Sequence, residues 1–414
     1  MVLVIGGGLA GSLAALALRE RGLAVTLLSP APSPATATQF SYGGVPWWAA
    51  PALRRAPELW QNLERRYGPL GWQRCQLTLH GGSANPPGTL GVPGPGADGL
   101  VSAHAARADR DCDPAATATT NSIAASNANS TTNITAYSTA NPQALAAARS
   151  GLQALLAAAG HGVLERLDPL GQHLALELPY GRVDGWVLAT ALPLALARAG
   201  VEQRTGHALA LKSQPGSPWQ VGLAGGGCLE ADTVLLAAGV ASARLWPPLA
   251  PDLATSWAGV LALDGDAVAD RDLPPGARSG IVMPLLGQRQ ALEQQSPSLE
   301  DSRAIVDAGL APWGSGWLLG QISLVNPLGQ FDPEPDPAWM EARLRSGLAR
   351  VWPQLADGAA TYHQVPVSFT ATGDPLMGPV ADAPGLWVCA GVSAPFAALP
   401  PLVEGLADQL AVAA

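Results

Sequence analysis

Apolar residues begin the chain in a short run and then recur with helical spacing. Val2–Ile5 is a run typical of a strand buried on both faces. The glycine-rich stretch Gly6–Gly11 follows it, and residues 12–21, rich in alanine and leucine, predict a helix that ends at Gly22. A second apolar run at residues 24–28 predicts another strand. The pattern therefore predicts a β-α-β unit at the start of the chain.

Helix and strand patterns alternate along the rest of the chain, with one interruption. Helices are expected at residues 53–67, 142–159, 185–199, 337–351 and 402–412. Strands are expected at residues 76–80, 208–211, 219–223, 230–238 and 385–391. Residues 81–142 are low in complexity, rich first in Gly and Pro and then in Ala, Ser, Thr and Asn. We interpret them as a surface insertion that is partly disordered.

Composition narrows the class of protein. Hydrophobic residues make up 48% of the chain and charged residues 13%, which is typical of a soluble globular protein. The net charge of −9 and the lack of a basic stripe argue against a nucleic-acid partner. Four dispersed cysteines without a CxxC pair predict no metal site and favour a reducing, cytoplasmic location. No uninterrupted apolar segment predicts a transmembrane span.

The glycine stretch has the spacing G-x-G-x-x-G between a strand and a helix. Gly6 permits a tight turn, Gly8 lets a pyrophosphate approach the backbone, and Gly11 lets helix and strand pack closely. Unpaired N–H groups at the helix start, from Leu9 and Ala10 onward, favour a bound phosphate. We predict that these residues bind a dinucleotide; the alternative is a glycine-rich turn that binds nothing.

One part of the nucleotide fingerprint is missing. The acidic residue that usually binds the ribose hydroxyls is expected near Ser29, yet no Asp or Glu occurs between Glu20 and Glu58. Ser29 is expected to bind the ribose, more weakly than a carboxylate. No Lys or Arg occurs between Arg21 and Arg54, so nothing there would bind the 2′-phosphate of NADP.

Four stretches together point to a flavin. They are residues 2–29, 181–184 with the following helix, 231–239, and 370–410. In this order they resemble the D-amino acid oxidase/glycine oxidase family of FAD-dependent oxidoreductases. The resemblance implies an α/β fold: a Rossmann-type FAD-binding domain split by a second, α+β substrate domain with a mixed sheet. It also implies hydride removal from a carbon next to an amine nitrogen, followed by reoxidation of the flavin.

The expected domain bounds follow from these stretches. The FAD-binding domain would comprise residues 1–50, 143–255 and 365–414, and the substrate domain residues 51–80 and 256–364. By the resemblance, Gly239 would lie along the cofactor. Thr38 and Gln39 would lie near the isoalloxazine, and Gly391 with Val392 near its pyrimidine end. Some relatives bond flavin to a cysteine before the C-terminal motif; this chain has none there, so FAD is expected to be noncovalent.

The chain departs from the family at the substrate site. Many members place an Arg just before the C-terminal motif, where it pairs with a substrate carboxylate. The matching residues 367–369 are all uncharged. Either Arg278, Arg289 or Arg303 replaces that Arg, or the substrate is not an ordinary amino acid.

Several residues have two interpretations. Tyr42, Trp47 and Trp48 form either a wall of the substrate pocket or ordinary packing between domains. His363, with its neighbour Tyr362, is an acid/base candidate or a structural residue, and Asp184 is catalytic or a helix N-cap. The sequence names no catalytic residue, because the flavin itself carries the redox chemistry.

Three functions remain open at this stage. The first is an FAD-dependent oxidase or dehydrogenase that oxidises the C–N bond of a small amine or amino acid. The second is a flavin-dependent dehydrogenase or hydroxylase of an apolar compound, favoured by the Trp-rich loop and the missing Arg. The third is a flavin-binding protein without turnover, favoured by the missing ribose acid.

Overall fold

A six-stranded sheet contains the first β-α-β unit. The computed structural model describes residues 1–30, 36–82, 142–167, 174–214, 216–331 and 333–413. The sheet order is β17 (Leu376–Pro379), β18 (Leu386–Ala390), β11 (Thr233–Leu236), β1 (Val2–Ile5), β2 (Val25–Ser29) and β7 (Glu202–Thr205). All pairs are parallel except β17 with β18. Parallel strands whose side chains are buried on both faces explain the apolar runs in the sequence.

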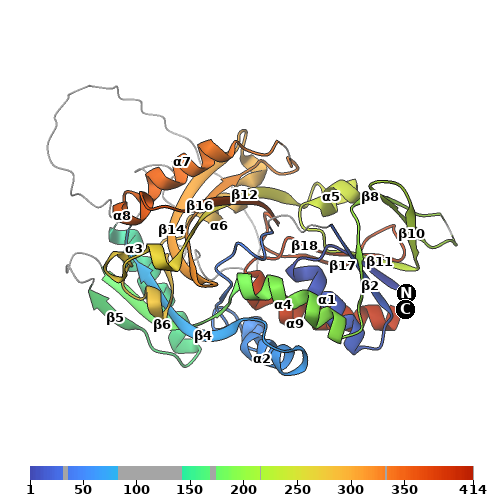
Figure 1. Ribbon diagram of the computed structural model, residues 1–414, viewed down its shortest axis with the longest axis horizontal. Helices are drawn as coiled ribbons and strands as arrows, with labels where there is room; N and C mark the ends of the chain where they lie inside the picture. The colour runs from blue at the N-terminus through green and yellow to red at the C-terminus, as the bar shows by residue number, and fades with distance from the viewer. Residues whose placement is uncertain (31–35, 83–141, 168–173, 215, 332, 414) are drawn as a thin grey trace, which may run out of the picture.

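Helices from distant parts of the chain cover this sheet. They are α1 (Leu9–Glu20), α4 (Gly185–Arg198), α9 (Pro395–Ala413) and the short α5 (Ala241–Leu245). Helices α1 and α9 pack against each other, and α2 (Ala56–Tyr67) packs on α9. Both termini lie at this end of the molecule (Figure 1).

A larger mixed sheet forms the other half of the molecule (Figure 1). Its order is β16 (Thr361–Phe369), β12 (Ala254–Leu263), β15 (Gly316–Val325), β14 (Arg303–Trp313), β13 (Gly280–Pro284), β4 (Trp72–His80), β6 (Leu174–Val183) and β3 (Gly44–Val45), with β5 (Leu164–Leu167) also on β6. Helix α7 (Pro337–Leu348) covers the outer face of β12, β14 and β15.

Smaller elements complete the described chain. A three-stranded antiparallel sheet contains β10 (Cys228–Ala231), β9 (Trp219–Leu223) and β8 (Ala208–Lys212). The remaining α-helices are α3 (Pro142–Ala158), α6 (Arg289–Gln294) and α8 (Pro353–Ala356). The mixed α/β architecture expected from the sequence is confirmed. Within the described residues, no helix is both long and apolar enough to cross a membrane.

The domain bounds remain a proposal. Strand β6 lies within residues 143–255, which we assigned to the FAD-binding domain, but it pairs with β4 in the large sheet. Most of the low-complexity stretch, residues 83–141, lies outside the described residues.

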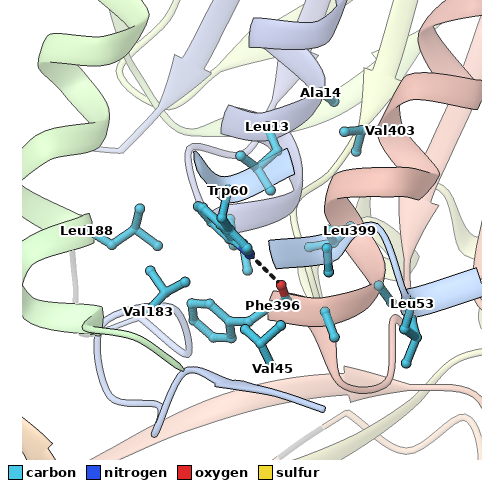
Figure 2. Close-up of a cluster of buried hydrophobic side chains, with 14 of the residues drawn as sticks. Leu13, Ala14, Val45, Leu53, Trp60, Val183, Leu188, Phe396, Leu399 and Val403 are labelled. Atoms are coloured by element: carbon cyan, nitrogen blue, oxygen red, sulfur yellow. Dashed lines mark hydrogen bonds between the residues drawn. The ribbon is translucent and has the colours of Figure 1, made fainter. Parts of the chain in front are cut away.

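The last helix is longer than the sequence suggested. Its apolar pattern predicted a start near residue 402, whereas α9 begins at Pro395 and includes Pro400 and Pro401. Proline has no N–H, so Pro400 cannot donate to the carbonyl of Phe396 one turn earlier. The indole Nε1 of Trp60 donates to that buried carbonyl instead, at 2.7 Å (Figure 2). A tertiary hydrogen bond thus replaces the missing helical one.

Replacing Trp60 with Phe should destabilise the protein. The W60F variant keeps an aromatic ring but leaves the Phe396 carbonyl buried without a donor, which costs about 1–3 kcal/mol. Urea unfolding should show a lower midpoint with a similar slope. The control is W339F, because Trp339 is 45% exposed. An unchanged midpoint for W60F would mean that the bond does not support α9.

Candidate cofactor and substrate site

Two glycines of the first turn have no room for a side chain. Gly6 has a φ of +114°, and a Cβ there would lie 2.3 Å from the carbonyl oxygen of Ala237. A Cβ on Gly11 would lie 1.9 Å from the carbonyl oxygen of Gly6. Both contacts are with backbone atoms, which cannot move aside cheaply. The turn after β1 is therefore held tightly between α1 and the end of β11.

The outer side of the same turn is open. The closest atom to a Cβ on Gly8 would be Thr38 Oγ1, at 3.6 Å, and a Cβ on Gly239 would meet nothing within 4 Å. Thr38 Oγ1 accepts a hydrogen bond from the N–H of Leu9 at 2.9 Å. The next N–H groups, of Ala10 and Gly11, lie in the first turn of α1, where helical acceptors are lacking. This open turn with a positive helix end fits a pyrophosphate.

Ser29 lies beside the glycine turn, at the end of β2. A Cβ on Gly7 would lie 2.8 Å from the Cβ of Ser29, so the two residues are direct neighbours. The adjacent strand β7 brings Thr205 next to Ser29. The end of β2 therefore offers hydroxyl groups, and no carboxylate of its own, at the place where the fingerprint expects a ribose.

The loop after β2 connects the glycine turn with the large sheet. The carbonyl oxygen of Gln39 accepts a hydrogen bond from Trp313 Nε1 at 2.8 Å. The Phe40 ring stacks on the His363 ring, with centroids 4.1 Å apart. Burial lowers the pKa of His363, which favours the neutral ring. We call the side of β16, β12, β15 and β14 that Phe40 and Tyr42 contact the inner face.

A second turn approaches from the C-terminal side. Gly391 has a φ of +69°, and a Cβ there would lie 2.8 Å from Thr370 Cγ2. Val392 is half-buried. Ala394 has a φ of +45° and, directly before Pro395, is one of two described non-glycine residues with a positive φ. Such strain is typical of functional sites.

The three aromatic residues of the first loop separate in the structure. The Tyr42 ring lies against Gly309 on the inner face. Trp48 is buried and donates from Nε1 to the carbonyl of Pro179 at 2.7 Å. Trp47 lies under the guanidinium of Arg74, with 5.8 Å between that group and the ring centroid. Both tryptophans therefore have the packing contacts that the sequence left open as an alternative.

Asp184 is an N-cap rather than an exposed group. Its carboxylate accepts hydrogen bonds from the N–H groups of Trp186 at 3.0 Å and Val187 at 3.3 Å. It also accepts from the N–H of Gly314 at 3.1 Å and pairs with Arg182 at 3.0 Å. The two charged side chains are 5% exposed. This network joins β6, α4 and the hairpin between β14 and β15.

A charged group on the inner face was not anticipated from the sequence. Asp307 lies on β14 and is half-buried. Its neighbours on α6 are Arg289 and the buried Glu293, which pair at 3.2 Å. Of the three arginines considered from the sequence, only Arg289 belongs to this cluster; Arg278 and Arg303 are exposed. The signal that was missed is a single acid in the otherwise apolar run of residues 304–311.

The side chains of the described residues do not gather into a metal site: they hold no group of three or more His, Cys, Asp or Glu that could bind an ion. The glycine turn after β1 instead fits a dinucleotide, and a second, larger sheet forms the rest of the fold. The chain belongs to the FAD dependent oxidoreductase family, whose model matches residues 1–408. FAD is therefore its cofactor, and the chain is an FAD-dependent oxidoreductase.

Solved structures share the fold over nearly the whole chain. Iminodiacetate oxidase from Chelativorans sp. BNC1 has a TM-score of 0.64 at 16% identity, covering 99% of this chain and 95% of that one. Glycine oxidase from Geobacillus kaustophilus has a TM-score of 0.64 at 16% identity, and the match covers 99% of this chain and 94% of that one. L-amino acid deaminase from Proteus vulgaris, lacking its specific insertion, has a TM-score of 0.60 at 15% identity, and the match covers 99% of this chain and 89% of that one. No curated protein sequence matches the chain.

An acidic residue at position 29 should tighten FAD binding. The S29E variant supplies a charged acceptor at the end of β2, and a charge-assisted hydrogen bond to the ribose should lower the Kd for FAD about tenfold, or about 1.4 kcal/mol. Titration of the FAD-stripped protein, followed by flavin fluorescence, measures the Kd. S29A is the control and should bind FAD no more tightly than the parent. Weaker binding by S29E would place the ribose elsewhere.

Asp307 should make stability depend on pH. Burial raises its pKa to about 6, against about 3.9 in an unfolded chain. The folded chain therefore binds more protons between these values, and its stability falls as pH rises from about 4 to about 6. D307N has no carboxyl group at this position and so does not lose this stability. The difference in urea midpoint, D307N minus parent, should therefore be larger at pH 7.5 than at pH 4.5. An equal difference at both pH values would contradict the raised pKa.

Proposed function

We propose that this protein oxidises the C–N bond of a small amine or amino acid. The carbon next to nitrogen gives up a hydride with its electron pair, and the nitrogen lone pair forms a C=N bond. FAD, when bound, would supply the acceptor for this hydride. Water then hydrolyses the imine to a carbonyl compound and a free amine or ammonia.

The family and the arrangement of its two sheets support this proposal. Three structures with this fold are named an iminodiacetate oxidase, a glycine oxidase and an L-amino acid deaminase, all enzymes of compounds with a C–N bond. The single observation that carries the proposal is the loop of Thr38 and Phe40. It contacts the start of α1 at one end and the inner face, through His363, at the other. These two contacts support a cofactor that would extend from the glycine turn toward the inner face.

The residues of the chain would divide the work as follows. The glycine turn and α1 bind the pyrophosphate, Ser29 the ribose, and Gly239 lines the path of the dinucleotide. Thr38 and Gln39 would lie on one side of the flavin ring, and Gly391 with Val392 would lie near its pyrimidine end. The start of α9 would stabilise negative charge on the reduced ring. The inner face excludes water from the reacting carbon. None of the residues 367–369, directly before the C-terminal motif, is a cysteine, so the FAD is proposed to be noncovalent.

The apolar-substrate alternative loses part of its basis. It relied on a pocket walled by Trp47 and Trp48, and their contacts are with Arg74 and Pro179. Tyr42 alone of the three reaches the inner face. We retain Tyr42 as a proposed residue of the substrate pocket. We also retain a cytoplasmic location and a small-molecule substrate, with no nucleic-acid partner; Cys75, Cys228 and Cys389 are free thiols.

Anaerobic reduction of the flavin tests the proposed reaction. The purified holoprotein is mixed with amines, amino acids and apolar alcohols, and the flavin absorbance is followed. At least one compound with a C–N bond should bleach the flavin, and its product should be the matching carbonyl compound. Bleaching by apolar alcohols alone would favour the second function, and a flavin that no compound reduces would favour a protein without turnover.

A further inference from the structure

The inner face is apolar at the position where a substrate carboxylate would need a cation. Phe369, one of the three residues 367–369 that match the position where many family members have an Arg, is 3% exposed. It belongs to one apolar cluster with Ile305 of β14, Val325 of β15 and Leu292 of α6. A guanidinium cannot occupy that space without displacing these side chains.

The carboxylate of Asp307 lies on β14, two residues after Ile305. Side chains alternate along a strand, so Asp307 lies on the same side as Ile305. It pairs across the sheet with Gln321, and the register between β14 and β15 shifts directly after Asp307. Such bulges re-aim side chains and are frequent near active sites. Asp307 also raises the pKa of Tyr42, second to burial, so the two groups lie near each other.

The charges around Asp307 sum to an excess of negative charge. Arg289 is within reach of two carboxylates, Asp307 and Glu293, and its ion pair is with Glu293. Besides Tyr42, the inner face has the titratable ring of His363, whose pKa is lowered by burial, so this ring carries no positive charge. Burial raises the pKa of Glu293 as well as that of Asp307. At a pH where both acids are ionised, one guanidinium against two carboxylates leaves one negative charge in a partly desolvated place. A cation would relieve that charge, whereas a carboxylate would add to it.

Tyr42 supplies a second polar group with nothing to bind. Its hydroxyl is buried and has no hydrogen-bond partner among the described residues. Burial and Asp307 raise its pKa, so the phenol stays neutral. Its oxygen can accept one hydrogen bond and its proton can be donated in another. A buried hydroxyl without a partner costs free energy that a bound ligand would recover.

We propose that Asp307 selects the substrate by charge: its carboxylate binds the ammonium group of an amine that has no carboxylate next to the reacting carbon, and it accepts one ammonium proton, which frees the nitrogen lone pair for oxidation. The Tyr42 hydroxyl accepts a second hydrogen bond from the same nitrogen. Phe369 and the buried apolar residues packed around it offer no cation to a substrate carboxylate. The proposal rests on the C–N oxidation proposed above and narrows its substrates to simple amines.

Two probes of the same shape and opposite charge test the proposal. Benzylamine and benzoate are titrated into the holoprotein at pH 8, where the first is a cation and the second an anion, and the shift of the flavin absorbance gives each Kd. The parent protein should bind benzylamine at least tenfold more tightly than benzoate. D307N should lose at least tenfold of that preference while keeping its FAD.

Controls separate charge selection from general damage. D301N alters an exposed carboxylate just before β14 and should leave the preference unchanged. Y42F removes the hydroxyl and should weaken benzylamine binding several-fold, which gives a second variant if D307N fails to fold. Tighter binding of benzoate by the parent, or an unchanged preference in D307N, would overturn the proposal.

The same samples distinguish this inference from the proposed function. If only amino acids bleach the flavin, C–N oxidation stands and selection by Asp307 is wrong. If no amine or amino acid bleaches it, C–N oxidation is wrong, and the probe titration still decides whether Asp307 selects cations.

Discussion

The contact between the glycine turn and the strand beside it sets the geometry on which the rest of the site depends. Gly6 lies against the backbone at Ala237, and Gly11 lies against the carbonyl of Gly6. A side chain at either position would push α1 away from β1 and β11. Because α1 is held so close, its first N–H groups reach the open side of the turn, and Thr38 can accept from Leu9 there. The loop that follows then lies on the inner face.

The second constraint is the scarcity of charge on that inner face. Phe369, Ile305 and Val325 make this face apolar, and β14 contributes one acidic residue to it, the half-buried Asp307. In such surroundings one charge outweighs many apolar contacts in deciding which ligand binds, because the free energy that its desolvation costs is not offset until a counter-charge binds.

The backbone geometry of the glycine turn could be predicted from the sequence more readily than the arrangement of the inner face. The glycine spacing is local, so Gly6, Gly8 and Gly11 could be read directly, and so could Gly239 at the end of its strand. The extent of α9 could not, because Pro400 signals a break and the compensating donor, Trp60, is distant in sequence. Asp307 was missed for a similar reason: its meaning depends on Tyr42 and Arg289, which only the fold brings near. Trp47 and Trp48 show the reverse case: they are neighbours in sequence, yet their side chains have different surroundings in the fold.

A crystal structure of the holoprotein, reduced anaerobically in the presence of benzylamine, tests the account most directly. The account predicts the FAD pyrophosphate at the start of α1, the flavin ring between the Thr38 loop and the Gly391 turn, and the amine nitrogen within hydrogen-bond distance of Asp307. A flavin ring directed away from the inner face, or an amine bound without contact to Asp307, would contradict it.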